Sequence, residues 1–309
     1  MKQSQSILAI IEPELNPHET VQRAAWLAAM YDQPLVLMLC DPDVGPLHAG
    51  WYQSNEAKEI GENIAAAQQE FMDGLADIAK TSGVDVTTVI LEHRPVADAI
   101  INEVRERNPA LVIKATHYHS AAQRAIFVDT DWYLLRACPC PLYFTKPAAI
   151  TEKADIIAAV DPTHAHDKSA SLDREIVSSA LDLAARTGGE VHLLHTYQRI
   201  AGVGREATKT FKPIRIPLHE VDARIRTEHR QKLDELAKEF DIKPDHVHQL
   251  PGATRDLLPT FARTHAAGVV VMGGLARWSL KRAVIGSTVE RVLDSVPCDI
   301  LIVRQPANE

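Results

Sequence analysis

The residues best suited to chemistry lie close together near the carboxyl end of the chain. The sequence Val271-Met-Gly-Gly-Leu-Ala-Arg-Trp-Ser-Leu-Lys-Arg-Ala-Val-Ile-Gly-Ser-Thr288 passes from an apolar run through a glycine turn and a basic loop to Gly-Ser-Thr. An anion needs backbone N–H groups directed at it with no side chain in the way, which glycines allow, and a helix N-terminus adds free amides and a favourable dipole. The segment therefore predicts a phosphate-binding loop built from Gly273, Gly286, Ser287 and Thr288.

The chain is a tandem repeat, because an altered copy of this segment occurs 158 residues earlier. Ala137-Cys-Pro-Cys-Pro-Leu142 matches Ser295-Val-Pro-Cys-Asp-Ile300 at that separation. Near the start of each half, Ile11-Glu12-Pro13 matches Val160-Asp161-Pro162 at a separation of 149 residues, and insertions in loops explain the difference. A chain of 309 residues is long enough for two cores. We expect domains at 1–147 and 153–309, joined by a short linker.

Composition restricts the class of partner. A hydrophobic content of 46% with 24% charged residues is ordinary for a soluble globular protein, and a net charge of −8 argues against binding to nucleic acid or anionic lipid. No apolar run has the length of a signal peptide core or a membrane helix, so a cytoplasmic protein without membrane insertion is expected. The four cysteines, which are interpreted as reduced core thiols, are Cys40, Cys138, Cys140 and Cys298.

Each half alternates strands and helices in an α/β pattern. Strands without polar alternation are typical of a parallel sheet covered on both faces. One-sided apolar stripes on the long helices, such as Ile60, Ile64, Phe71, Leu75 and Ile78, are expected to pack on it. The predicted strands are 6–11, 35–40, 86–91, 111–114 and 142–144 in the first half, and 155–160, 191–194, 246–250, 269–272 and 300–303 in the second.

Each half ends in an apolar strand, which would be an exposed edge in an open sheet. Exposed edges invite aggregation unless something covers them. Edge-to-edge pairing of the two halves, as a pseudo-dimer within one chain, is the simplest solution. Whether two whole chains also form a homodimer stays open.

The doubled α/β pattern with its glycine, Gly-Ser and Pro-Cys-Asp-Ile-Leu-Ile-Val-Arg signature resembles the universal stress protein family, in its tandem, E-type form. The resemblance implies two flavodoxin-like (adenine nucleotide alpha hydrolase-like) domains. Each would hold a five-stranded parallel sheet with helices on both faces. It also implies an ATP site between the first and fourth strands. The rule that ligands bind where the strand order of a doubly wound sheet reverses predicts the same crevice.

The resemblance assigns the nucleotide site to the second half. It implies ATP or a related adenine nucleotide, with Mg²⁺ only as its companion. Ala276 stands where the family usually has glycine, which costs about 1 kcal/mol if the position needs a positive φ. The matching positions are Val160, Asp161, Pro162, Gly273, Ala276, Gly286, Ser287 and Thr288.

The first half departs from this pattern. Gly273 corresponds to Ala115, and Gly286 and Ser287 correspond to Val128 and Asp129. Valine blocks close approach to the backbone, and a carboxylate repels phosphate. We therefore expect no ATP in the first half. Glu12, in place of the usual aspartate, agrees with that loss.

Metal chemistry and catalysis have weaker support. Three His-x-His pairs occur, 117/119, 164/166 and 246/248, but a metal site needs three or four converging ligands, so none is predicted. No nucleophile elbow or Walker motif is present and no catalytic residue is assigned; at most, slow ATP hydrolysis is expected. Lys281 and Arg282 could neutralise phosphate or form a solvated loop.

Three functions follow from these features. The first is a stress-response sensor or regulator in which nucleotide binding in the second half alters the surface shown to an unidentified protein partner. The second is a nucleotide-independent module that holds an apolar small molecule or a protein in the first-half crevice. Tyr118, Ile126, Phe127 and Val128 would line that crevice. The third is a metal-dependent hydrolase built on His164 and His166.

Overall fold

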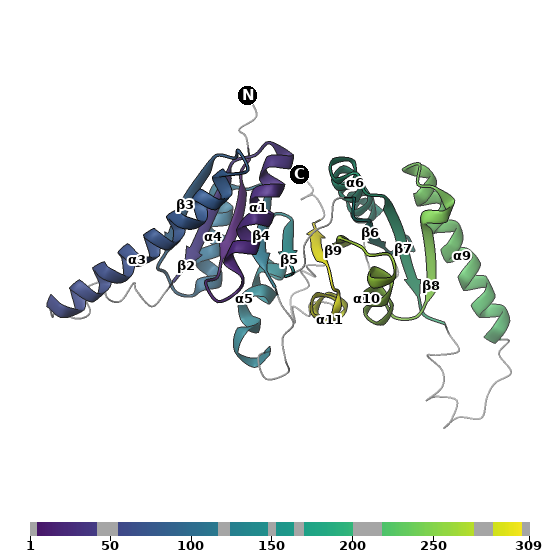
Figure 1. Cartoon of the computed structure of the whole chain (residues 1–309). Coiled ribbons are helices and arrows are strands. Elements are labelled where there is room, and N and C mark those ends of the chain that lie inside the picture. Colours follow the sequence, from purple (N-terminus) through teal and green to yellow (C-terminus); the bar gives the residue numbers. More distant parts are fainter. Residues whose placement is uncertain are drawn as a thin grey trace, which may run out of the picture. The chain divides into compact units, whose positions relative to one another are not determined.

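The computed structural model describes residues 5–41, 55–116, 124–147, 153–163, 170–199, 218–274 and 287–304, without the side chains of 124–129, 287, 288, 290 and 291. Described residues up to Pro147 form one compact unit, and those from Lys153 onward form another (Figure 1). Each unit is taken by itself below. The edge-to-edge pairing of the two halves stays a prediction.

The first unit holds a five-stranded parallel sheet in the order β3-β2-β1-β4-β5. Its elements are β1 (Ile7–Ile11), α1 (Pro17–Tyr31), β2 (Leu35–Cys40), α3 (Asn55–Lys80), β3 (Val86–Leu91), α4 (Val96–Arg107), β4 (Leu111–Ala115), α5 (Arg124–Ala137) and β5 (Leu142–Thr145).

The second unit repeats this arrangement in the order β8-β7-β6-β9-β10, again with parallel pairing. Its elements are β6 (Ile156–Val160), α6 (Ala170–Thr187), β7 (Val191–Tyr197), α9 (Leu218–Glu239), the 3₁₀ turn η1 (Pro244–His246), β8 (Val247–Pro251), α10 (Thr254–Thr264), β9 (Val269–Gly273), α11 (Ser287–Ser295) and β10 (Asp299–Val303). The predicted α/β class and the ten predicted strands are confirmed, with ends that differ by at most a few residues.

In both units the first strand pairs on one side with the second strand and on the other side with the fourth. The winding direction therefore reverses between β1 and β4, and between β6 and β9. Ile10 aligns with Lys114 in the first unit, and Ala159 aligns with Met272 in the second. Ile10 and Ala159 are 149 residues apart, and Lys114 and Met272 are 158 residues apart, which are the two separations found in the sequence. Each residue of one crevice can therefore be matched to its counterpart in the other.

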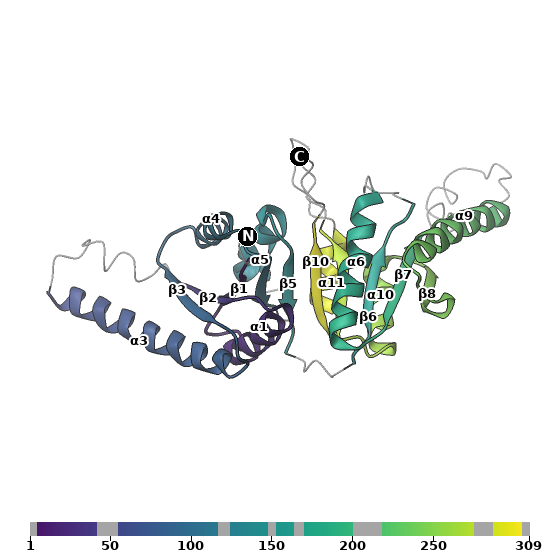
Figure 2. The same ribbon diagram turned by 90° about the horizontal axis from the view of Figure 1, so that it is seen from above.

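Helices cover both faces of each sheet. In the first unit α1 packs against α3 on one face, and α4 packs against α5 on the other (Figure 2). In the second unit α6 packs over β6 and β9, and α10 packs against α11. The central strands are almost fully buried, as their uninterrupted apolar residues predict. Within the described residues, no helix combines the length and hydropathy needed to cross a membrane.

One part of the helix-stripe prediction is wrong. Leu75 is buried as predicted, but Ile60 is 53% exposed and Ile64 and Phe71 are only partly buried. The reason is length: α3 has 26 residues, and its amino-terminal part reaches beyond the strands that it covers (Figures 1 and 2). The periodic apolar stripe therefore predicts which side of this helix faces inward. It does not predict how much of the length of the helix lies over the sheet.

Two adjacent glycines end α6 and begin the return to the sheet. Gly188 takes a positive φ of 75°, and its N–H donates to the Ala184 carbonyl oxygen at 2.8 Å, as expected for a helix C-terminus. A Cβ on Gly189 would lie 2.2 Å from the Ala154 carbonyl oxygen, closer than any contact a folded chain tolerates. Glycine at 189 is therefore required by the close passage of the chain before β6.

We expect Gly189→Ala to destabilise the protein by about 1–3 kcal/mol, because the methyl group can be placed only by moving backbone. Gly74→Ala in α3 is the matched control: its Cβ meets no atom within 4 Å, and alanine is the better helix former by about 0.5–1 kcal/mol. Urea unfolding followed by circular dichroism measures both. A Gly189→Ala protein as stable as the wild type would contradict the predicted clash.

Candidate functional site

The candidate site of the second unit lies at the carboxyl ends of β6 and β9. Because Ala159 pairs with Met272, the residues that follow them in the two strands, Val160 and Gly273, end at the same edge of the sheet. Asp161 and Pro162 continue from that edge. Four of the predicted site residues are thus brought together at the reversal point. Ala276 and Gly286 lie outside the described residues, whereas Ser287 and Thr288 begin α11, so the predicted helix start at Ser287 is confirmed.

Asp161 is held in place by its neighbours. Its backbone N–H donates to Asp173 Oδ1 at 3.0 Å, and Asp173, in the first turn of α6, is only 1% exposed. The Thr163 hydroxyl donates to Asp161 Oδ1 at 2.8 Å. The Asp161 side chain keeps 14% of its surface exposed. A fixed carboxylate with some exposure can accept further hydrogen bonds, for example from hydroxyl or amino groups of a ligand.

Two histidines close to Asp161, His195 and His229, were not predicted from the sequence as part of the site. His195 of β7 is buried, with Nδ1 3.1 Å from the Val160 carbonyl oxygen and 4.0 Å from Asp161 Oδ1. A carbonyl oxygen can only accept, so Nδ1 is assigned as the donor and Nε2 as the acceptor from His229 Nδ1, 2.8 Å away in α9. At the corresponding position the first unit has Leu39. Only the strand register, which places His195 beside Val160, reveals this polar network.

Gly273 has a packing reason to be glycine. A Cβ there would lie 2.8 Å from Leu172 Cδ2, so α6 can approach the end of β9 only because no side chain intervenes. At Gly274 a Cβ would lie 2.6 Å from Ile302 Cγ2. The Gly274 N–H donates to the Val303 carbonyl oxygen at 3.0 Å, so that amide is used within the sheet. The glycine pair therefore also shapes the crevice wall.

An open cavity of about 270 Å³ adjoins the end of β6 between α6 and α9. Charges of both signs line it, and Arg174 Nε donates to Glu239 Oε1 at 2.6 Å across it. Its lining residues are Pro162, Ala170, Asp173, Arg174, Lys232, Glu235, Leu236 and Glu239.

The equivalent crevice of the first unit contains a buried lysine. Lys114 of β4 is 3% exposed and occupies the position that Met272 has in the second unit. Its Nζ lies 2.6 Å from Glu12 Oε2, 2.7 Å from Asp131 Oδ1 and 3.3 Å from the Ala115 carbonyl oxygen. An ammonium group has three donors, so these three oxygens can satisfy it completely. A single cation here is matched by two carboxylates.

The electrostatics of this group follow from burial and pairing. Burial alone would lower the pKa of Lys114, but Asp131 and Glu12 outweigh it and raise that pKa above its usual value. Burial raises the pKa of Glu12 more than Lys114 lowers it. Lys114 is thus held as a cation. Because two carboxylates already face it, it offers little attraction to a phosphate group.

The predicted strand ending at Lys114 is confirmed to within one residue, but the buried ion pairs of Lys114 were not predicted from the sequence. A lysine inside a strand that is covered on both faces requires a buried partner of opposite charge. The lysine in this apolar strand was therefore the sequence feature that could have predicted the ion pairs. The carboxylate assigned to the first-unit crevice from the sequence was Asp129, whose side chain lies outside the described part of the chain. The acid that the structure places there is Asp131, two residues later in α5.

A family model described as the universal stress protein family matches residues 4–146 and again residues 163–304. The chain belongs to the universal stress protein family. The first match spans all five strands of the first unit, and the second begins after β6 and spans the other four strands of the second unit.

Relatives with the same doubled organisation cover nearly the whole chain. "Universal stress protein E" of Escherichia coli (strain K12) is 26% identical over 98% of this chain and 95% of its own length. "Universal stress protein E homolog" of Haemophilus influenzae is 24% identical over 96% of each chain. A crystal structure of a universal stress protein from Archaeoglobus fulgidus covers 99% of this chain and 98% of its own, with 14% identity and a TM-score of 0.68, and supports the fold.

The cysteines of this universal stress protein are free thiols in the described structure. Cys138, Cys140 and Cys298 are buried, and the Cys138 and Cys140 sulfur atoms lie 3.6 Å apart. At the end of β2, burial raises the pKa of Cys40 to about 12, with further contributions from the carboxylates of Glu12 and Glu103. Cys40 therefore stays a thiol at neutral pH and is a poor nucleophile.

Several predicted groups fall outside the described residues. They are the histidine pairs 117/119 and 164/166, the basic residues Lys281 and Arg282, and the first-unit residue Tyr118. For Ile126, Phe127 and Val128 the backbone lies in α5, but the side chains are not part of the description.

We expect Lys114→Met to destabilise this universal stress protein by about 3–5 kcal/mol, because the buried Asp131 carboxylate and the partly exposed Glu12 carboxylate lose their cation. Lys80→Met is the matched control, since Lys80 pairs with Asp77 on the surface and its loss costs about 1 kcal/mol or less. Replacing the whole group, as Lys114→Met with Glu12→Gln and Asp131→Val, should restore most of the stability. Denaturant unfolding of the four proteins tests this; equal losses for the two lysine variants would show that the buried group is not the cause.

Proposed function

We propose that this chain is a stress-response sensor or regulator whose second unit binds ATP or a related adenine nucleotide at the carboxyl ends of β6 and β9. Its first unit does not bind nucleotide. Occupancy of the second crevice would change the surface presented to a partner protein. Mg²⁺ would enter only with the nucleotide, and any hydrolysis would be slow.

The observation that carries this proposal is the difference between the two crevices. In the first unit Lys114, Glu12 and Asp131 form a closed group with a net negative charge. A triphosphate there would have to displace a lysine from two carboxylates and then lie beside them, which like-charge repulsion disfavours. In the second unit the residue at the lysine's position is Met272. Among the described residues near Met272 there is no counterpart of the lysine with its two paired carboxylates, and the acids at the end of β6 are Asp161 and Asp173.

The residues of the second crevice fit an adenine nucleotide. Asp161 offers a fixed, partly exposed carboxylate for ribose or adenine. Glycine at 273 and the helix start at Ser287 agree with a phosphate loop that leads into a helix N-terminus. Other universal stress proteins have been solved in complex with cAMP and, from Archaeoglobus fulgidus, with dAMP. Adenine nucleotides are thus ligands within the family.

Gly286→Val should weaken ATP binding by roughly 100-fold or more, because losing two amide–phosphate hydrogen bonds costs about 1.5–3 kcal/mol each. Valine at 286 both blocks approach to the backbone and disfavours a positive φ. Val128→Ala, at the corresponding position of the first copy, is the matched control and should bind ATP as the wild type does. Isothermal titration calorimetry measures both, and an unchanged affinity for Gly286→Val would refute the site assignment.

Asp161→Asn separates recognition of the nucleoside from recognition of phosphate. If Asp161 contacts ribose or adenine, this change should weaken adenosine and ATP by the same factor, about 10-fold for one charged hydrogen bond. Gly286→Val should weaken ATP far more than adenosine. Competition of the two ligands against a fluorescent adenine nucleotide gives both factors. A loss confined to ATP in Asp161→Asn would place this carboxylate near the phosphates instead.

A further inference from the structure

We propose that the second unit holds a divalent transition-metal site formed by His192, His248 and His265, at the end of the sheet opposite the nucleotide crevice. His192 is the second residue of β7, and His248 is the second residue of β8. His265 follows the last residue of α10. Asp161, in contrast, follows the carboxyl end of β6. The three histidines come from elements that the fold brings together, and they are separate from the residues proposed to bind nucleotide.

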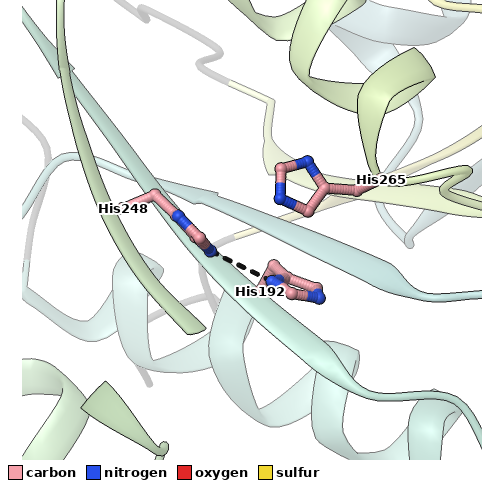
Figure 3. A group of neighbouring side chains, drawn as sticks. All are labelled: His192, His248 and His265. Carbon is pink, nitrogen blue, oxygen red and sulfur yellow. Dashed lines mark hydrogen bonds between the residues drawn. The ribbon is translucent and has the colours of Figure 1, made fainter. Parts of the chain in front are cut away.

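The three imidazoles converge. One ring nitrogen from each lies within 4.8 Å of the others, and the His192 Nδ1 and His248 Nε2 atoms are 3.0 Å apart (Figure 3). A tetrahedral ion with Zn–N bonds of about 2.0–2.1 Å needs nitrogens roughly 3.4 Å apart. Small rotations of the rings are therefore enough to reach that geometry. An ion would replace the hydrogen bond between His192 and His248.

Two of the remaining ring nitrogens, those of His192 and His265, have partners of the kind that orient metal ligands. His192 Nε2 lies 3.3 Å from Asp155 Oδ2, which leaves Nδ1 directed at the centre of the cluster. His265 Nδ1 donates to the Phe261 carbonyl oxygen at 3.0 Å, which leaves Nε2 as the ligand atom. Metal-binding histidines usually donate their second N–H to a carboxylate or a carbonyl in this way.

Packing fixes the rings further. Phe261 stacks on His265 at a centroid separation of 3.9 Å and meets the edge of His248 at 4.9 Å. The His246 ring contacts the His192 ring in a tilted arrangement with centroids 4.5 Å apart, and His246 Nε2 lies 3.4 Å from Glu190 Oε2. His246 is therefore a positioning residue and not a fourth ligand.

The chemistry of the group matches a borderline-soft ion. Burial, followed by repulsion from neighbouring histidines, lowers the pKa of His248 to about 4 and also lowers the pKa of His192. Neutral imidazole is the form that binds metal, and three imidazoles suit Zn²⁺, Cu²⁺ or Ni²⁺ rather than Mg²⁺, which prefers oxygen. His248 and His265 are only partly buried, so an ion can reach the site from solvent. A water molecule would complete four-coordination.

The site would join β7 and β8 to the segment between α10 and β9. Within the second unit these elements include the outermost strand, β8. Metal binding would therefore stabilise the edge of the unit proposed to bind nucleotide. The inference does not depend on nucleotide binding, because none of its ligands belongs to that crevice.

Zinc titration of the full-length protein, with Zn²⁺ alone and a competing chromophoric chelator, tests the site. We expect one tight equivalent in the wild type and in the control His219→Gln, which removes an exposed histidine of α9. His265→Gln and His248→Gln should lose that equivalent. Asp155→Asn should weaken it about 10–100-fold, the usual effect of removing an outer-shell partner. Mg²⁺ should not compete.

Three outcomes would overturn the proposal: no stoichiometric zinc in the wild type, unchanged affinity in His265→Gln, or equal loss in His219→Gln. A variant that fails to fold is detected by circular dichroism. In that case, imidazole NMR of the wild type decides the question. Zinc should then shift the ring signals of His192, His248 and His265 before those of any other histidine, and a diffuse shift of many histidines would count against the site.

Discussion

The pairing of the first strand with the fourth in each unit is the constraint on which both crevices depend. It sets the carboxyl ends of β1 and β4, and of β6 and β9, side by side at the point where the winding reverses. Helices cannot cover that point as they cover the faces of the sheet, so the groups at the strand ends must be satisfied by one another or by a ligand. The two copies meet this requirement with different residues, and the proposed division of function between them is based on that difference.

In the first unit the requirement is met internally. Lys114 donates to two carboxylates and a carbonyl oxygen, and nothing is left over for an anion. Desolvating these charges costs about as much free energy as their attraction returns, so the group adds little net stability. Removing one partner is nevertheless strongly destabilising, so the group keeps the crevice closed. In the second unit Met272 occupies the position of Lys114. Nearby, His195 forms hydrogen bonds with the Val160 carbonyl oxygen and with His229, and its Nδ1 lies 4.0 Å from Asp161 Oδ1. Under the proposed function, the first copy would act without a nucleotide, and the second would use its polar groups to bind one.

Sequence reasoning recovered what depends on periodicity and on the repeat. The ten strands and the start of α11 at Ser287 follow from apolar runs and local chemistry. The repeat gave the equivalence of Glu12 with Asp161, which the strand registers reproduce. The sequence did not predict contacts of a side chain with residues that lie far from it along the chain. Lys114 meets Glu12 across 102 positions, and Asp131 comes from a helix.

The histidine cluster shows the same limit more sharply. Adjacent pairs such as His246-Val-His248 were weighed as possible ligand pairs, whereas the converging set takes one member of that pair and two distant residues, His192 and His265. His246 is the last residue of η1 and His248 lies in β8, and His246 Nε2 is directed to Glu190 while His248 Nε2 is directed to His192. Only the pairing of β7 with β8 and the position of α10 bring the three rings together. Gly273 is a similar case, since its contact with Leu172 could not be inferred from a loop motif.

Photo-crosslinking of the full-length protein with an azido-adenine analogue of ATP, followed by mass spectrometry of its peptides, tests the central claim most directly. The account predicts one nucleotide per chain, with label confined to peptides of the second unit that contain or adjoin Asp161 and competed away by unlabelled ATP. Label on first-unit peptides around Glu12 or Lys114, or two equivalents per chain, would contradict it.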